Sequence, residues 1–168
     1  MMTTDSTRST ETSIDMKEIV FEVDGEVRGK GRPRFTQAGK VYTPMHTRLY
    51  EKQIRRAFIE RGGTMFDGPV HIDIECVAGV QRSASKAARK MRLAGQELSI
   101  RKPDLDNVEK CVLDALNGLA YADDVSVMSV RKIKGRYEET PRLIVRVREI
   151  DAAEICRAHQ YMWVDEHF

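Results

Sequence analysis

The chain has 168 residues, 41% of them hydrophobic and 32% charged, with a formal net charge of +2 at pH 7. This length suits one domain with a continuous core, and no apolar run approaches the roughly 18 residues that a membrane span needs. Cys76, Cys111 and Cys156 are odd in number and far apart, and the four histidines are scattered. These spacings argue against a disulfide framework and against a zinc site.

The N-terminal segment differs in composition from the rest of the chain. Residues 1–17 are mostly Thr, Ser, Asp and Glu and contain no apolar stretch of the kind found in a signal peptide. Such a composition predicts a disordered tail. We therefore expect one domain over residues 18–168, and a cytoplasmic protein with no membrane partner.

A strand and a basic loop are predicted first. Apolar and acidic side chains alternate from Ile19 to Val27, which is typical of a half-buried strand. The segment Gly29 to Arg34 reads Gly-Lys-Gly-Arg-Pro-Arg, which is too rich in Gly and Pro for a helix. It lacks the G-x-x-x-x-G-K-[ST] spacing of a nucleotide-binding loop. We interpret it as a basic loop that contacts a sugar-phosphate backbone.

Three elements are predicted in the middle of the chain. A helix should run from Thr43 to Arg61, with Thr43 as N-cap and Pro44 at the first helical position. Strict alternation from Val70 to Val77 predicts a strand. Ser83 to Leu93 should form a short basic helix that begins at Ser83.

The last third of the chain predicts two helices and two strands. Apolar residues recur at helical spacing from Asp104 to Asn117. Strands follow at Val125 to Lys134 and at Leu143 to Glu149, joined by a polar turn around Gly135 to Thr140, and a helix from Asp151 to Tyr161 closes the chain. The pattern predicts an α/β protein of the α+β kind, a single domain with a mixed sheet of about four strands packed with helices.

Basic residues are concentrated in two segments. The segment from Arg28 to Arg61 contains ten Lys and Arg residues but only two Glu residues. The segment from Gln81 to Lys102 contains seven Lys and Arg residues, and its single acidic residue is Glu97. Segregation of this kind builds a positive surface that neutralises phosphates and releases counterions. The charge pattern therefore indicates a polyanionic partner.

Two acidic groups flank the predicted helix of residues 104–117. Asp104 and Asp106 lie in its first turn, and Asp123 and Asp124 follow its end. Crowded carboxylates repel one another unless a cation lies between them, and oxygen ligands suit Mg²⁺ or Mn²⁺. The strand from Val125 must re-enter the sheet, which would bring the second group toward the first. The sequence permits this return but does not require it.

The same residues also have a structural interpretation. An Asp at a helix start caps free N–H groups, and Lys110 lies one turn after Asp106, where an ion pair would contribute a few tenths of a kcal/mol. Asp123 and Asp124 are ordinary turn residues. On the residues alone, a shared metal site and a purely structural role both remain open.

A longer pattern carries a resemblance. Lys102-Pro103-Asp104-Leu105-Asp106-Asn107, with Lys110, Asp114-Ala115-Leu116-Asn117-Gly118 and Asp123-Asp124, resembles the RusA family of Holliday-junction resolvases. The resemblance covers roughly residues 19–149. Upstream of the motif it includes the basic loop at Gly29 to Arg34, Tyr42-Thr43-Pro44 and the basic helix. The segment Gln81 to Ser85 lacks the Trp of many relatives, a difference that concerns local loop packing.

The resemblance implies a small homodimeric endonuclease that depends on Mg²⁺, with Mn²⁺ as a substitute, and makes paired cuts in four-way junction DNA. It implies that Asp104, Asp106 and Asp124 are catalytic metal-binding carboxylates, that Asp123 is an accessory metal ligand, and that Lys110 is catalytic. The expected DNA-binding residues are Lys30, Arg32, Arg34, Lys86, Lys90 and Lys102.

Two other functions are consistent with parts of the pattern. The basic segments alone would suit a DNA-binding module without catalysis. The D-x-D spacing of Asp104 and Asp106 also occurs in Mg²⁺-dependent phosphohydrolases of the dehalogenase type. In those enzymes an apolar strand precedes the motif, whereas Arg101-Lys102-Pro103 precedes it here, so this second alternative is disfavoured.

Overall fold

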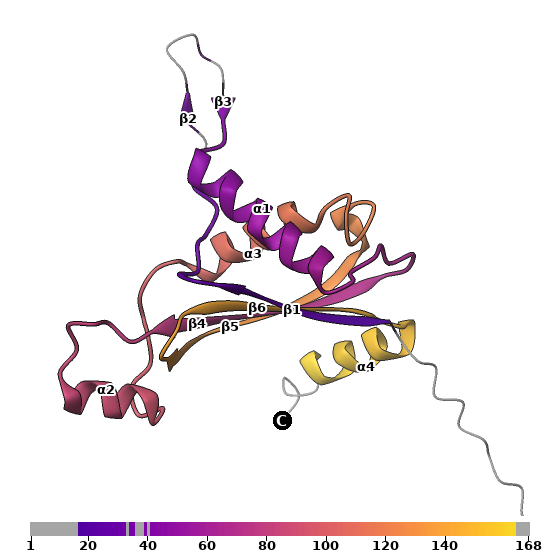
Figure 1. The fold of residues 1–168 in the computed structure, drawn as a ribbon. Helices are drawn as coiled ribbons and strands as arrows, with labels where there is room; N and C mark the ends of the chain where they lie inside the picture. The colour runs from indigo at the N-terminus through magenta and orange to yellow at the C-terminus, as the bar shows by residue number, and fades with distance from the viewer. Residues whose placement is uncertain (1–16, 33, 36–38, 40, 164–168) are drawn as a thin grey trace, which may run out of the picture.

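A four-stranded sheet lies at the centre of the computed structural model, which describes residues 17–163 except 33, 36–38 and 40. Helices α1 (Met45–Glu60) and α3 (Leu105–Leu116) cover one face, and α4 (Ala152–Trp163) lies against the other (Figure 1). Of the predicted N-terminal tail only Lys17 is described, and its backbone N–H and C=O both bond to Glu149. In the described part of the chain, no helix is both long and apolar enough to cross a bilayer.

The sheet consists of β1 (Glu18–Asp24), β4 (Val70–Gly79), β5 (Val127–Glu138) and β6 (Arg142–Glu149), in the order β1-β6-β4-β5. Strands β4 and β5 are parallel, and the other two pairings are antiparallel. This arrangement confirms the predicted mixed four-stranded sheet in an α+β fold. Strand β5 is an edge strand, and its many basic side chains are of the kind that keep an exposed edge from pairing with another chain.

The hydrophobic core lies between the sheet and the pair α1 and α3. Its members are the alternating inward side chains of the strands and one stripe from each helix. They include Phe21, Ile54, Phe58, Ile72, Ile74, Val108, Val112, Leu116, Leu143, Val145 and Val147, all at most 1% exposed. The two helices are also joined by a hydrogen bond from Arg55 Nη1 to the carbonyl oxygen of Ala115 (2.8 Å). The packing therefore fixes α3 on the sheet.

Two elements lie outside this core. Helix α2 (Lys86–Leu93) has no buried residue, and its N-cap is Ser85, whose hydroxyl accepts from Ala88 N–H (3.2 Å). The predicted N-cap Ser83 is therefore wrong, because Ser85 supplies the oxygen that the first turn needs.

Strands β2 (Arg34–Phe35) and β3 (Val41–Tyr42) pair as a short hairpin, where only a loop was predicted. Helix α1 follows Pro44 as its N-cap, one residue later than predicted.

Strand β5 extends beyond its predicted end at Lys134. The predicted turn at Gly135 is instead a bulge in the strand, with φ +126° and a shift in the register with β4. The extra residue changes which face the following side chains occupy. Before the bulge Arg131 pairs with Asp73, and after it Arg136 pairs with Glu75. Both pairs lie on the sheet face opposite α3. Lys134 between them points to the α3 side.

Candidate metal and nucleic-acid site

The start of α3 presents three charged side chains to solvent. Asp104 is the N-cap, Asp106 lies in the first turn and Lys110 follows one turn later, and all three are exposed. Residues four apart lie on the same helix face, so Lys110 is beside Asp106. The positive end of the helix dipole favours the negative charge of the two carboxylates.

In the described part of the chain, these side chains form neither the helix cap nor the ion pair that a purely structural role would require. Asp104 makes no side-chain capping bond, although its backbone carbonyl accepts the first helical hydrogen bond. Asp106 and Lys110 form no ion pair, whereas other charged residues of α3 do. The carboxylates of Asp104 and Asp106 are therefore available for another partner.

Two lysines beside α3 form ion pairs with carboxylates of the same chain. Lys132 of β5 pairs with Glu109, and Lys30 pairs with Asp114. Lys30 was predicted to bind DNA, and its side chain, 31% exposed, is held against α3 in this structure. A DNA contact by Lys30 remains a prediction.

The second acidic group lies at the 3-10 turn η1 (Asp124–Ser126), just before β5. The Val125 N–H donates to Asp123 (3.1 Å), and this bond lowers the pKa of the Asp123 carboxyl. A hydrogen bond with Asp123 raises the pKa of Asp124. Buried Tyr121 anchors the preceding loop by donating to the carbonyl oxygen of Leu113 (3.1 Å). The two carboxyl groups thus share one small exposed corner.

The two acidic groups lie at opposite ends of α3. Strand β5 runs antiparallel to the helix, because Lys132 contacts Glu109 and Lys134 contacts Pro103. The beginning of β5, and Asp124 with it, is therefore next to the helix C-terminus. A helix of 12 residues is about 18 Å long at 1.5 Å per residue. Among the described residues, no group of three or more His, Cys, Asp or Glu side chains is placed to hold a metal.

Each group taken alone suits a divalent cation. Within the described structure, Asp104 and Asp106 offer hard carboxylate oxygens without competing side-chain hydrogen bonds, and Asp123 and Asp124 place two carboxyl groups side by side at an exposed turn. Mg²⁺ and Mn²⁺ bind through such oxygens and usually through only one or two protein carboxylates. The donor chemistry fits these ions, while one chain does not gather both groups.

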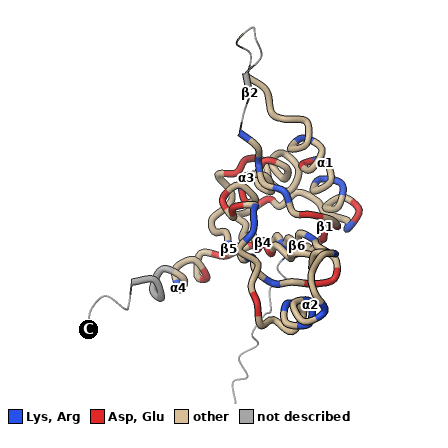
Figure 2. The backbone as a smooth tube through the Cα atoms, turned by 90° about the vertical axis from the view of Figure 1, so that its left-hand side faces the viewer, with Lys and Arg blue, Asp and Glu red and all other residues tan. Residues whose placement is uncertain are grey.

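The predicted DNA-binding residues lie on both sides of the acidic helix start. Arg34 is in the β2–β3 hairpin, with exposed Arg32 just before it, and exposed Lys86 and Lys90 are on α2. Exposed Lys102 immediately precedes the motif. Figure 2 shows the hairpin and α2 at opposite ends of the molecule, with the acidic residues of α3 between them. A long polyanion that contacts both basic regions would cross the start of α3.

Comparison with known proteins gives the class of the chain. A family model described as "Endodeoxyribonuclease RusA" matches residues 24–148. The chain is also 36% identical over 140 residues to "Uncharacterized protein YqaN" of Bacillus subtilis (strain 168), an alignment that covers 80% of this chain and 98% of that protein. The chain therefore belongs to the RusA endodeoxyribonuclease family, whose activity is the hydrolysis of DNA.

Sequence reasoning missed the residues that hold the approach to α3. Lys134 Nζ donates to the carbonyl oxygens of Arg101 (3.1 Å) and Pro103 (3.2 Å). The Lys30 N–H donates to the carbonyl oxygen of Asn107 (2.8 Å). A side chain that bonds to backbone leaves no spacing signal in a sequence. Gly135 was predicted to lie in a turn; a glycine that continues a strand pattern can instead mark a bulge, and this is the signal that was missed.

Proposed function

We propose that this protein is a Mg²⁺-dependent endonuclease that resolves four-way DNA junctions by paired phosphodiester cuts. The observation that carries the proposal is the start of α3. Asp104, Asp106 and Lys110 are exposed there, and in the described structure none of their side chains is used for capping or for an ion pair. Membership of the RusA family supplies the chemistry, and the carboxylates supply the ligands for the cation.

Each residue of the site would have a separate role in the reaction. Asp104 and Asp106 hold the cation, and Asp124, with Asp123 as accessory, supplies further oxygen ligands. A cation held there would lower the pKa of a bound water and offset the negative charge of the scissile phosphate. Lys110 places a point charge beside the leaving oxygen, where it stabilises the developing negative charge or donates a proton.

A homodimer is part of the proposal. A two-fold axis presents two equal sites, which matches the symmetry of two strands cut across a junction. The separation of Asp104 from Asp124 along α3 supports a site completed between chains, in which Asp124 of one copy serves the helix start of the other. Such a site binds its cation only in the dimer.

Junction recognition would depend on shape rather than on base sequence. The basic residues of the hairpin, of α2 and of Lys102 are suited to phosphate contacts, which position DNA without reading bases. Cleavage should therefore be selective for branched DNA and weaken steeply as salt rises.

The test is cleavage of a synthetic four-way junction, with a linear duplex of the same sequence as control, in Mg²⁺, in Mn²⁺ and in EDTA. We expect symmetric cuts on the junction that require the metal. Tight junction binding without cleavage in either metal would favour the non-catalytic DNA-binding module. Hydrolysis of small phosphate monoesters, with no DNA cleavage, would favour the phosphohydrolase.

A further inference from the structure

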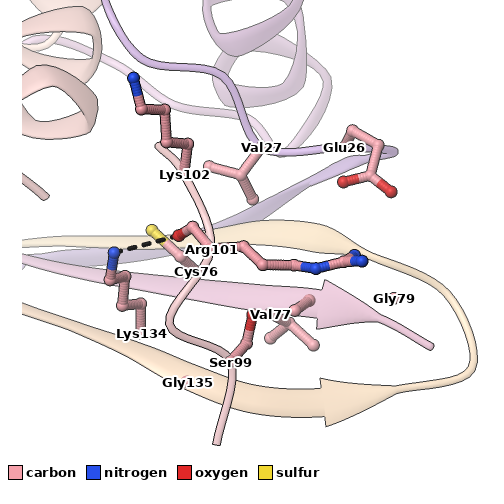
Figure 3. Close-up of a pocket in the computed structure, with 11 residues that line it drawn as sticks. Glu26, Val27, Cys76, Val77, Gly79, Ser99, Arg101, Lys102, Lys134 and Gly135 are labelled. Atoms are coloured by element: carbon pink, nitrogen blue, oxygen red, sulfur yellow. Dashed lines mark hydrogen bonds between the residues drawn. The ribbon is translucent and has the colours of Figure 1, made fainter. Parts of the chain in front are cut away.

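We infer that Lys134 is a positioning residue, which holds the metal-binding carboxylate Asp104 in place through the backbone that precedes it. The inference rests on the proposed function, since it concerns the same site. Lys134 is half-buried in β5 and lies on the α3 side of the sheet, in phase with Lys132 and just before the bulge at Gly135. Figure 3 shows its side chain pointing at the segment of Arg101 and Lys102.

The contacts of Lys134 are unusual for a lysine. Its ammonium donates to two carbonyl oxygens, those of Arg101 (3.1 Å) and Pro103 (3.2 Å), and among the described residues it has no carboxylate partner. Lys132, two residues earlier in β5, instead pairs with the side chain of Glu109. Lys134 therefore fixes backbone, whereas Lys132 forms an ordinary ion pair.

The Pro103 carbonyl determines the direction of Asp104. The carbonyl group of Pro103 and the N–H of Asp104 belong to one planar peptide unit. A hydrogen bond that fixes this plane also fixes where the Asp104 side chain leaves the backbone. Asp104 makes no side-chain capping bond, so the position from which its carboxylate starts depends on the backbone.

The same segment is held from its other side. The N–H of Lys30 donates to the carbonyl oxygen of Asn107 (2.8 Å), and a Cβ at Gly29 would lie 2.8 Å from Asn107 Cβ. The Ser99 N–H donates to the carbonyl oxygen of Gly135 (2.8 Å). Beside this segment lies a cavity of about 40 Å³, lined by Arg101, Lys102 and Lys134 among others. In the described structure, the side chain that donates to the Pro103 carbonyl oxygen is that of Lys134.

A positioning role and a purely electrostatic role predict opposite effects on metal affinity. Removing a nearby positive charge reduces repulsion of a cation and should tighten metal binding. Removing a group that orients a ligand should weaken it, by about tenfold for partners of metal ligands in general. The sign of the change therefore separates the two roles without any measurement of cleavage.

The experiment measures Mn²⁺ binding to the full-length protein in the absence of DNA, by electron paramagnetic resonance or calorimetry. The variants are Lys134→Met and, as a matched control, Lys132→Met, which removes the same charge from the same strand. We expect about tenfold weaker binding for Lys134→Met and unchanged or tighter binding for Lys132→Met. Equal losses in both variants, or unchanged or tighter binding in Lys134→Met, would overturn the inference.

Folding is checked by thermal unfolding of each variant. If Lys134→Met does not unfold cooperatively, Lys134→Gln decides, because its polar side chain is uncharged and one atom too short to reach both carbonyl oxygens. Weaker Mn²⁺ binding supports the inference, and equal or tighter binding refutes it. The proposed function fails separately. A wild type that neither binds Mn²⁺ nor cuts junctions refutes both, whereas an active wild type with unchanged metal affinity in Lys134→Met refutes only the role of Lys134.

Discussion

The sheet face away from α3 and the start of α3 differ in whether their charges are paired within the chain. On the face away from α3, here called the outer face, basic side chains pair with neighbouring carboxylates: Arg131 with Asp73, Arg136 with Glu75, Arg142 with Glu22, Arg146 with Glu18 and Arg148 with Glu154. At the start of α3, Asp104, Asp106 and Lys110 have no such partner in the described structure. Charges that stabilise a fold are paired inside it, and charges left over are those that an external partner must satisfy.

Asp106→Asn should have the largest effect. The amide keeps the shape of the side chain but removes a charged ligand, so we expect junction cleavage to fall by about 100-fold or more, as when one electrostatic contributor to a transition state is lost. Junction binding should persist or tighten, because repulsion between carboxylate and phosphate decreases. Single-turnover cleavage and gel-shift titration measure the two quantities.

The matched control for Asp106→Asn is Asp73→Asn on the outer face. Hydrogen bonds from His71 and Arg131 hold the pKa of Asp73 below its ordinary value, although burial acts to raise it. Its loss should cost stability and leave the cleavage rate within about twofold. Equal loss of cleavage in both variants would mean that Asp106 is a structural residue.

Mixing two inactive variants tests whether the site forms between chains. In a heterodimer of Asp106→Asn and Asp124→Asn, a site shared between chains leaves one of two sites fully intact. We expect the mixture to regain single nicks, while a mixture of Asp104→Asn and Asp106→Asn stays inactive because both changes affect the same end of α3. Sites built within single chains predict no recovery in either mixture.

Lys110→Met should reduce the maximal cleavage rate by about 100-fold, the lower range for loss of a proton donor or a positioned charge. Its effect should appear in kcat, with the junction Kd changed less than about threefold, since phosphate contacts elsewhere dominate affinity. Rate and binding measurements at saturating Mg²⁺ separate the two. A change confined to Kd would place Lys110 among the DNA-binding residues instead.

Glu154→Gln, on the outer face, should have the smallest effect. The hydrogen bond from Arg148 holds the pKa of Glu154 below its ordinary value. A lowered folded pKa means that the stabilisation is present at neutral pH and is lost as pH falls below the ordinary range of Glu. The substitution should lower the free energy of unfolding by about 0.5–1 kcal/mol at pH 7.

Urea unfolding at pH 7 and near pH 3 checks this expectation. The difference between Glu154→Gln and the wild type should shrink at the lower pH, because protonation of Glu154 weakens its pairing with Arg148. Junction cleavage should be unaffected at pH 7. A loss of cleavage would show that the outer face also contributes to the site.

The sequence was sufficient for the sheet, since period-two alternation identified β1, β4 and β6 to within a few residues. It failed at Gly135, where a bulge resembles a turn because both use a glycine with positive φ. The motif placed Asp104 and Asp106 at the helix start. It did not determine which end of α3 receives Asp124, because this depends on the direction in which β5 passes the helix.

The close contact between Gly29 and Asn107 separates two kinds of evolutionary change. Gly29 and Lys30 contact α3, and α1 begins at Met45, so both ends of the segment that contains the hairpin are held by the fold. We expect insertions and substitutions in this segment to leave the acidic helix start in place. A lineage can therefore change the residues of the hairpin while it retains the acidic start of α3.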